Sequence, residues 1–361
     1  MRIGIDIGGT KTDAVVISDD GSIIERIRLV TGFGADAVVQ SAVDAIELLL
    51  ERTGLRLGDV RSVGIGIPGT VDSTSGHVSH AVNLGFDTLD LGDALEERLS
   101  VRVRVENDVK AAALGAYSLI GASRAASPGL SRIPGPATHA DTDTSTSTST
   151  GTGTGTGESR HSETDQAPPS MAYLNLGTGL AAGIVLNGEL WRGSWGAAGE
   201  IGHIPIDPSG ALCPCGQRGC LETVASGSGI ARQWQTDDPK PAQSLFAAAD
   251  AGDPHAADIR SWFIDGIASA VRILVLTVDV DTVVIGGGLS NLGAPLLDAV
   301  TEVLAEWAES SPFIASLDLG RRVELLPEGF PAAAVGAALV GVTPPASPST
   351  PTLVPTSEAT A

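Results

Sequence analysis

The spacing of apolar and polar residues predicts alternating strands and helices from the start of the chain. Residues 37–49 place their apolar side chains on one helical face. Residues 63–67 and 101–105 are apolar runs with little alternation, which is typical of strands buried on both faces. Ahead of these elements, short apolar runs separated by Gly/Thr and Asp/Gly turns predict an antiparallel meander at residues 2–7, 14–17 and 23–29. The first part of the chain is therefore expected to form an α/β sheet.

The same order of signals returns in the second half of the chain. Strand, Gly/Thr turn, strand, turn and strand follow one another over residues 172–191. Further helices and strands are expected at residues 259–276, 282–285, 295–307, 322–325 and 332–339. A duplicated unit of this kind would place two glycine turns face to face. Because glycine lacks a Cβ atom and allows φ above zero, such turns let backbone N–H groups approach an anion, and a nucleotide's phosphates would fit between them.

Two segments have the composition of disordered chain and are set aside from the fold. Residues 123–170 are rich in Ser, Thr, Gly and Pro, and residues 343–361 are rich in Pro, Ser and Thr. The Gly-Thr repeat at 151–157 is no phosphate-binding loop, because no strand precedes it and no lysine follows it. We expect a disordered insert and a disordered tail.

Composition and charge narrow the class of protein. A chain of 361 residues, 42% of them hydrophobic, is long enough for two domains with proper cores. A formal net charge of −21 argues against nucleic acid as a partner, since phosphate binding needs clustered Lys and Arg. There is no run of 18 uninterrupted apolar residues, and the chain opens on a strand pattern rather than a signal peptide. We expect no membrane segment and a cytoplasmic location.

The strongest chemical signal is a cluster of cysteines. Cys213, Cys215 and Cys220 form a C-x-C-x4-C pattern, and His203 lies ten residues upstream. Three thiolates and an imidazole fill the tetrahedral positions of a closed, structural zinc site. A disulfide with a spare thiol is the alternative, but the odd count and close spacing make good bridge geometry hard to reach.

Two carboxylates flank this cluster, Glu200 before it and Glu222 after it. A metal that holds the loop would fix their directions, which suits a ligand with many hydroxyl groups. The residues alone leave another interpretation open, in which both are solvated surface charges and His203 is an ordinary core histidine.

Asn107 and Asp108 follow a predicted strand and offer hydroxyl chemistry. Phosphoryl transfer to an alcohol needs alignment and a carboxylate that accepts the hydroxyl proton, and Asp108 suits that task. Asn107 offers both a donor and an acceptor to a neighbouring hydroxyl. The same pair could instead be the N-cap of a helix over residues 111–119.

Taken together, the motifs are similar to those of a known family. They comprise Asp6-Ile7-Gly8-Gly9-Thr10-Lys11, Glu106-Asn107-Asp108, Leu176-Gly177-Thr178-Gly179, Gly199-Glu200-Ile201-Gly202-His203, the Cys213 to Glu222 motif and Gly286-Gly287-Gly288. The chain outside the insert and the tail resembles the ROK family of sugar kinases and sugar-responsive repressors. The resemblance implies a two-domain α/β fold of the actin-like ATPase (ribonuclease H-like) type, with a structural zinc loop and a disordered insert.

The resemblance also implies the nucleotide site. ATP and Mg²⁺ would be the cofactors beside structural Zn²⁺, with Asp6 near the magnesium and residues 286–288 by the adenosine. The glycines concerned are Gly286, Gly287 and Gly288. The phosphate turns would be formed by Gly8, Gly9, Thr10 and Lys11 and by Gly177, Thr178 and Gly179. Lys11 lacks the spacing of a P-loop lysine. After Gly179 the family continues with further glycines, whereas Leu180-Ala181-Ala182 follows here and adds Cβ atoms near the second turn.

For the acceptor sugar, the resemblance implies ATP-dependent phosphorylation of a hexose with Asp108 as catalytic base. Glucose is the first candidate, and N-acetylglucosamine, N-acetylmannosamine and fructose are alternatives. Trp191 and Trp195 are interpreted as packing residues rather than a sugar platform. His203 would also be a zinc ligand, and the family implies a homodimer. The sugar hydroxyls would contact Asn83, Asn107, Glu200, His203 and Glu222.

The expected domains are residues 1–110 and 111–330, with a final helix over 331–342 that packs on the first domain. Two other functions compete with a kinase. A regulator of the same family would need a DNA-binding domain, for which the strand at residue 2 leaves no room ahead of it. A sugar sensor without catalysis is disfavoured by Asp108 and by the two phosphate turns.

Overall fold

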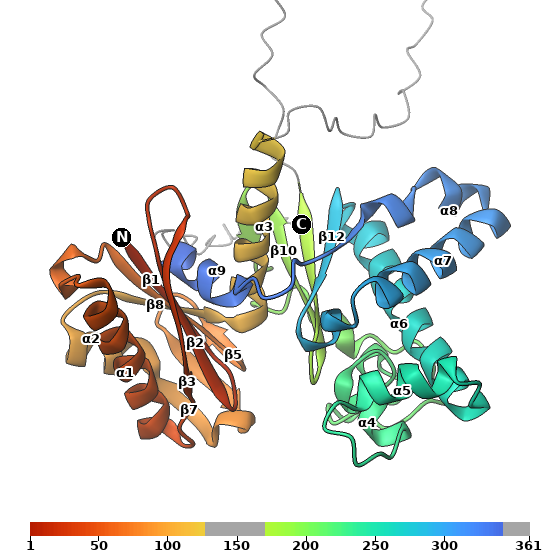
Figure 1. Ribbon diagram of the computed structural model, residues 1–361, viewed down its shortest axis with the longest axis horizontal. Coiled ribbons are helices and arrows are strands. Elements are labelled where there is room, and N and C mark those ends of the chain that lie inside the picture. The colour runs from red at the N-terminus through yellow and green to blue at the C-terminus, as the bar shows by residue number, and fades with distance from the viewer. Residues whose placement is uncertain (127–169, 342–361) are drawn as a thin grey trace, which may run out of the picture.

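The computed structural model describes residues 1–126 and 170–341, which form two α/β halves joined by a pair of central helices (Figure 1). Most of the predicted insert and the predicted tail lie outside the described residues. The insert was predicted to begin at residue 123, but the helix before it continues to Ala126.

The N-terminal half is built on a five-stranded sheet of order β3-β2-β1-β4-β8. Its helices α1 (Ala35–Thr53) and α2 (Leu91–Leu99) lie on the outer face of this sheet (Figure 1). The predicted meander and the two predicted buried strands are present. The strands are β1 (Arg2–Ile7), β2 (Lys11–Ile17), β3 (Ile23–Val30), β4 (Ser62–Ile67) and β8 (Val103–Asn107).

The C-terminal half repeats this connectivity in a sheet of order β11-β10-β9-β12-β13. In both halves the first three strands pair antiparallel and the last two join in parallel. The repeat inferred from the sequence is therefore present in the topology. The strands are β9 (Met171–Leu176), β10 (Leu180–Leu186), β11 (Glu189–Trp191), β12 (Thr282–Gly286) and β13 (Val323–Leu325). The helices are α4 (Gly227–Gln233), α5 (Pro241–Asp250), α6 (Pro254–Val278), α7 (Ala294–Ser310) and α8 (Pro312–Ser316).

Between β4 and β8 the N-terminal half carries a small antiparallel sheet that the sequence did not reveal. Its strands are β5 (Thr70–Asp72), β6 (His77–Ala81) and β7 (Phe86–Asp90). They are short and largely polar, so they lack the apolar run or clean alternation by which strands are recognised. This sheet matters because its first strand and the end of its second reach the cleft between the halves.

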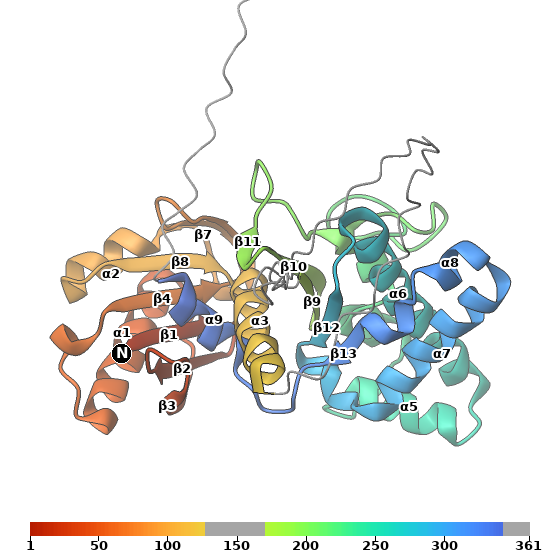
Figure 2. The same cartoon turned by 90° about the horizontal axis from the view of Figure 1, so that it is seen from above.

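Two helices, α3 (Asp108–Ala126) and α9 (Ala332–Val340), lie between the two sheets (Figure 2). Their backbones approach so closely that a Cβ atom on Gly336 would lie 1.7 Å from the Ala111 carbonyl oxygen. The helix α9 also packs on the N-terminal sheet, where a Cβ atom on Gly4 or Gly64 would lie 1.9 or 1.8 Å from a carbonyl oxygen of α9. Glycine is required at these positions by packing.

Among the described residues, one helix, α6, is long and apolar enough to span a membrane. Half of its apolar window is buried inside the protein, where Ile259, Phe263 and Ile267 join the C-terminal core. The helix therefore packs as the core helix of its half.

Candidate active site

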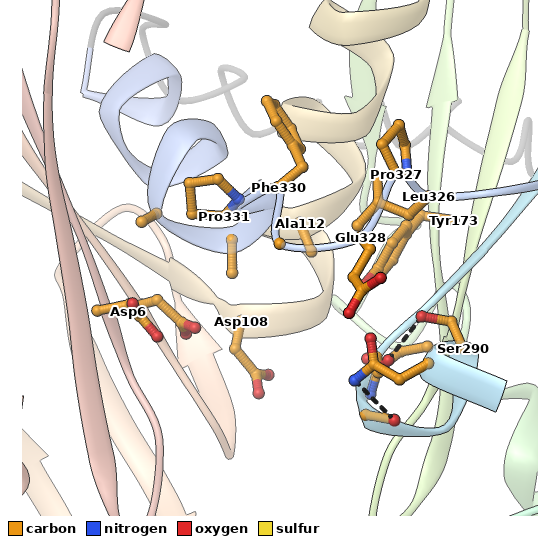
Figure 3. Close-up of a pocket in the computed structure, with 18 of the residues that line it drawn as sticks. Asp6, Asp108, Ala112, Tyr173, Ser290, Leu326, Pro327, Glu328, Phe330 and Pro331 are labelled. Atoms are coloured by element: carbon orange, nitrogen blue, oxygen red, sulfur yellow. Dashed lines mark hydrogen bonds between the residues drawn. The ribbon is translucent and has the colours of Figure 1, made fainter. Parts of the chain in front are cut away.

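A cavity of about 490 Å³ opens between the two halves. Figure 3 shows Asp6 and Asp108 on its N-terminal side, with Tyr173, Glu328 and Ser290 across from them. Asp6 comes from the end of β1 and Asp108 from the first position of α3. Gly287 and Gly288 follow β12 and line the same cavity. Thus residues that the family resemblance assigned to magnesium and adenosine share one space.

A second cavity of about 320 Å³ collects the predicted sugar residues. Its lining includes the residues Asn107, Asp108, Glu200, His203 and Glu222. Among these, only Asp108 also lines the first cavity. A carboxylate that lines two neighbouring cavities can act on a chemical group transferred from a molecule in one cavity to a molecule in the other.

The local hydrogen bonds divide two tasks between Asn107 and Asp108. Asn107 caps α3, since its Oδ1 accepts from the Lys110 amide at 3.1 Å and from the Val109 amide at 3.0 Å. Both hydrogen bonds from described residues to the Asp108 carboxylate end on Oδ1, one from Val109 N at 2.9 Å and one from Asn107 Nδ2 at 3.0 Å. Among the described residues, no hydrogen bond ends on Asp108 Oδ2, so this oxygen can accept a further one. The capping interpretation is therefore confirmed for Asn107, and the catalytic interpretation of Asp108 stays a prediction.

The two cleft carboxyls are held in a poorly solvated place. Both are half-buried where they line the cavity, and desolvation raises the pKa of Asp108, opposed by its hydrogen bonds from Val109 and Asn107 and assisted by the nearby negative charge of Glu200. Burial and the charge of Asp108 raise the pKa of Asp6 to about 8. A carboxyl with a raised pKa is a stronger base once ionised, which suits Asp108 for accepting a proton.

The predicted zinc ligands converge. The ligand atoms of His203, Cys213, Cys215 and Cys220 all lie within 4.8 Å of one another. Cys215 Sγ and Cys220 Sγ are 3.6 Å apart, and Cys213 Sγ is 3.8 Å from His203 Nδ1. Zn–S bonds of about 2.3 Å in a tetrahedron put two sulfurs about 3.8 Å apart, so the donor set fits this ion. His203 Nδ1 faces the thiols, while the residue itself also lines the second cavity.

Glu222 ties this loop to the second glycine turn. Its Oε2 accepts from the Leu180 amide at 2.9 Å, and a Cβ atom on Gly179 would lie 2.5 Å from the same oxygen. The turn is held further by α4, whose first amides, Gly227 N and Ser228 N, donate to the carbonyls of residues 177 and 178 at 2.9 and 3.0 Å. The second turn is therefore held by hydrogen bonds from α4 and, through Leu180, by Glu222.

One part of the glycine argument was wrong. Gly8, Gly9, Gly177 and Gly179 all have negative φ, and among the predicted nucleotide glycines only Gly287 has a positive one, at 85°. Space at these turns is tight, since a Cβ atom on Gly8, Gly9 or Gly177 would lie 3.1–3.3 Å from a neighbouring atom and one on Gly179 would displace the end of the Glu222 side chain. The conformational freedom invoked from the sequence is not used there.

Some predicted residues lie outside the two cavities. Gly8, Gly9 and Thr10 form the β1–β2 turn and Lys11 begins β2, and a Cβ atom on Gly9 would lie 3.1 Å from the Asn83 carbonyl oxygen. Asn83 itself is exposed beside this turn. Gly286 is buried in β12 and packs against Tyr173, so it supports the cavity rather than lining it. The second-turn residues Gly177 and Thr178 also lie outside, next to α4.

The interpretation of the tryptophans as packing residues was wrong. The Trp195 residue is 94% exposed and Trp191 is 52% exposed. Trp195 lies in a turn between Gly193 and Gly196, both with positive φ, which carries its side chain away from the core. The Ala181 and Ala182 residues that raised doubt about the phosphate turn line the second cavity.

Several residues that line the cavities were missed, and Asn175 and His80 are two of them. Asn175 lines both cavities. It holds the position in β9 that Asp6 holds in β1, so the internal repeat could have revealed it. His80, which lines the second cavity, sits at the end of β6 with φ of 59° and gave no pattern in the sequence.

Comparison with known proteins agrees with this geometry. The ROK family matches residues 2–127 and 141–340. A glucokinase from Halalkalibacterium halodurans is 30% identical over 325 residues, covering 85% of this chain and 86% of that protein. An N-acetylmannosamine kinase from Vibrio cholerae is 27% identical over 315 residues, covering 86% and 90%. A ROK family glucokinase from Streptomyces griseus, solved with glucose and AMPPNP, superposes with a TM-score of 0.67 at 27% identity, covering 94% of this chain and 98% of that one.

Proposed function

The chain belongs to the ROK family and is a sugar kinase of the actin-like ATPase fold, and from that premise we propose that it transfers the γ-phosphoryl group of ATP to glucose. The product would be glucose 6-phosphate. The observation that carries this proposal is the place of Asp108 in the lining of both cavities, one of which is also lined by Asn107, Glu200, His203 and Glu222 and the other by Asp6, Gly287 and Gly288.

In this proposal Asp108 is the general base. Its Oδ2 accepts the proton of the sugar hydroxyl as that oxygen bonds to the γ-phosphorus and the bond to the leaving ADP oxygen breaks. Burial supports the assignment, because a desolvated carboxylate binds a proton more readily than one in water. Asn107, Glu200, His203 and Glu222 orient the hydroxyls, and Asn83 is proposed to reach the sugar from the rim of the cleft.

On the nucleotide side, the turns at residues 8–11 and 177–179 take the phosphates and Gly287 and Gly288 lie by the adenosine. Asp6 is the carboxylate placed to hold Mg²⁺, which when bound neutralises phosphate charge. The remaining chemistry is alignment, for which this chain supplies a cleft with fixed walls.

We also propose that His203 and the three cysteines bind a structural Zn²⁺ ion. The support is the closeness of their ligand atoms and the match between the Sγ separations and a tetrahedral site. All four positions are filled by protein, so the metal would hold the loop and carry no step of the reaction.

The test is turnover with ATP and a panel of glucose, fructose, N-acetylglucosamine and N-acetylmannosamine. Glucose is expected to show the highest kcat/KM. The relative from Vibrio cholerae is an N-acetylmannosamine kinase. A preference for N-acetylmannosamine would make that sugar the substrate in place of glucose and leave the proposed mechanism unchanged. No turnover of any of these sugars would contradict the proposed function. Light scattering on the purified protein would test the homodimer that the family implies.

A further inference from the structure

A buried ion pair joins the two halves directly beside the catalytic turn. Glu106, at the end of β8, is 1% exposed. Its Oε2 accepts from Arg192 Nε and from Arg192 Nη2, each at 2.7 Å. Arg192 follows β11 in the C-terminal half, so residues 86 positions apart in the sequence meet here. A carboxylate this deeply buried is stable only when it is paired and hydrogen-bonded.

The other oxygen of Glu106 holds the catalytic turn. Glu106 Oε1 accepts from the Asn107 amide at 3.0 Å. The carboxylate therefore connects the backbone of the residue that precedes Asp108 to a side chain of the opposite half. A second contact strengthens the link, since Lys110 Nζ, on the first turn of α3, donates to the Gly196 carbonyl.

On the C-terminal side, backbone hydrogen bonds restrain the segment from Arg192 to Glu200, both within itself and to β10. The Ala198 amide donates to the Arg192 carbonyl at 3.2 Å, and the Ala182 amide donates to the Gly199 carbonyl at 2.7 Å. Gly199 has a φ of 94°, and a Cβ atom there would lie 1.8 Å from the Ala182 carbonyl oxygen. Because the segment is restrained in this way, a shift of Arg192 would also move Glu200.

We propose that Glu106 and Arg192 form a positioning pair that sets the separation between the two walls of the sugar site. One wall carries Asn107 and Asp108, and the other carries Glu200 and His203. Neither Glu106 nor Arg192 lines either cavity, so both act through the residues they hold. The inference rests on the proposed function, because it states what the pair does for the acceptor sugar.

The test uses R192K, which keeps the charge but cannot repeat the paired donation of the guanidinium group. The control is R322K. Arg322 is a comparably shielded arginine whose Nη1 lies 3.0 Å from Asp279 within the C-terminal half, away from the cavities. For R192K we expect kcat to fall and the KM for sugar to rise, together lowering kcat/KM on the order of 10-fold to 10²-fold, with the KM for ATP within about twofold. For R322K both sugar constants should stay at the native values.

Coupling within the pair is tested by the double variant. If Glu106 and Arg192 act as one unit, E106Q/R192K should lose no more kcat/KM than the worse of the two single variants. If the losses in kcat/KM of the two single variants multiply in the double variant, the two residues do not act as one unit. An R192K protein that melts at a lower temperature yet keeps the native kcat and sugar KM would also contradict the pair, because that is the behaviour of a purely structural ion pair.

The outcomes also separate this inference from the proposed function. A native protein that phosphorylates hexoses alongside an equally active R192K contradicts the pair and leaves the function intact. A native protein that phosphorylates no hexose contradicts the function. In that case the pair is judged by calorimetric titration of glucose, which R192K must bind more weakly than R322K does.

Discussion

The two halves share one strand order but differ in what their shared positions carry. The end of β1 carries the carboxyl of Asp6, while the matching position of β9 carries the amide of Asn175. Behind the first turn lies exposed Asn83, whereas the second turn is braced by α4, Glu222 and the cysteine loop. A duplicated frame thus separates two tasks. In the proposed reaction, the N-terminal half would supply the carboxyls, and the C-terminal half would supply the hydrogen-bonded wall that orients the sugar.

The Asp108→Asn variant is the most direct test of this difference between the two halves. If the N-terminal half carries the chemistry, kcat should fall on the order of 10² to 10⁴, because the general base is lost while the hydrogen bonds to Oδ1 remain possible. Glucose binding, measured by calorimetry, should persist. The exposed Asp258→Asn on α6 serves as control and should retain native turnover. Undiminished turnover of Asp108→Asn would remove this residue from the mechanism.

The pH dependence of kcat/KM for the sugar gives the next largest effect. Asp108 must be ionised to accept a proton, and burial raises its pKa above the ordinary value of 3.8. Activity is therefore lost as pH falls through that raised pKa, by about tenfold per unit well below it. Steady-state assays from pH 4 to 8 should place the acid limb above the range of a solvated aspartate. Activity that stays level down to pH 4 would show that the working carboxylate is not desolvated.

Loosening the wall of the C-terminal half should act on binding more than on chemistry. Cys215→Ser, or removal of the metal by a chelator, is expected to raise the KM for sugar on the order of 10-fold to 10²-fold, because the ligands hold the loop between Glu200 and Glu222. Ser209→Ala, an exposed change in the same loop, is the control. Elemental analysis should find one zinc per chain in native protein purified without chelator. Its absence would contradict the zinc site.

A smaller effect concerns stability without magnesium or nucleotide. The pKa of Asp6 is about 8 in the folded protein and near 3.8 when unfolded, so the folded state binds the proton more tightly. Stability is therefore greatest below the unfolded pKa and falls as pH rises towards 8. Asp6→Asn should melt higher than the native protein at pH 8 and alike at pH 4, with roughly 2–4 °C for each kcal/mol gained. Equal melting temperatures at both pH values would show that Asp6 is not desolvated.

The smallest effect is expected at Trp195. Its side chain is 94% exposed and outside both cavities, so Trp195→Ala should change the free energy of unfolding by no more than about 0.5 kcal/mol. Urea denaturation measures this difference. A larger loss would mean that the ring is covered in solution, for example by a second copy of the chain.

The sequence predicted most elements of both sheets, because apolar runs and turn residues are local signals. It missed β5 to β7, whose short polar strands are stabilised by their neighbours rather than by their own pattern. It also misjudged the glycine turns, whose backbone does not use positive φ and whose close neighbours, such as Glu222 beside Gly179, come from residues far along the chain. Asn175 was within reach of the sequence through the internal repeat, whereas His80 was not.

Local sequence patterns were sufficient to predict the duplicated α/β framework, the Cys/His set proposed to bind a metal and the residue types available for hydroxyl chemistry. These properties reside in short stretches of chain, where spacing and side-chain chemistry suffice. The folded structure was needed to show that Asp108 lines two cavities, that Asn107 caps α3, and that Glu106 pairs with Arg192 of the other half. Such facts depend on how separate elements pack, and packing joins residues that no local pattern relates.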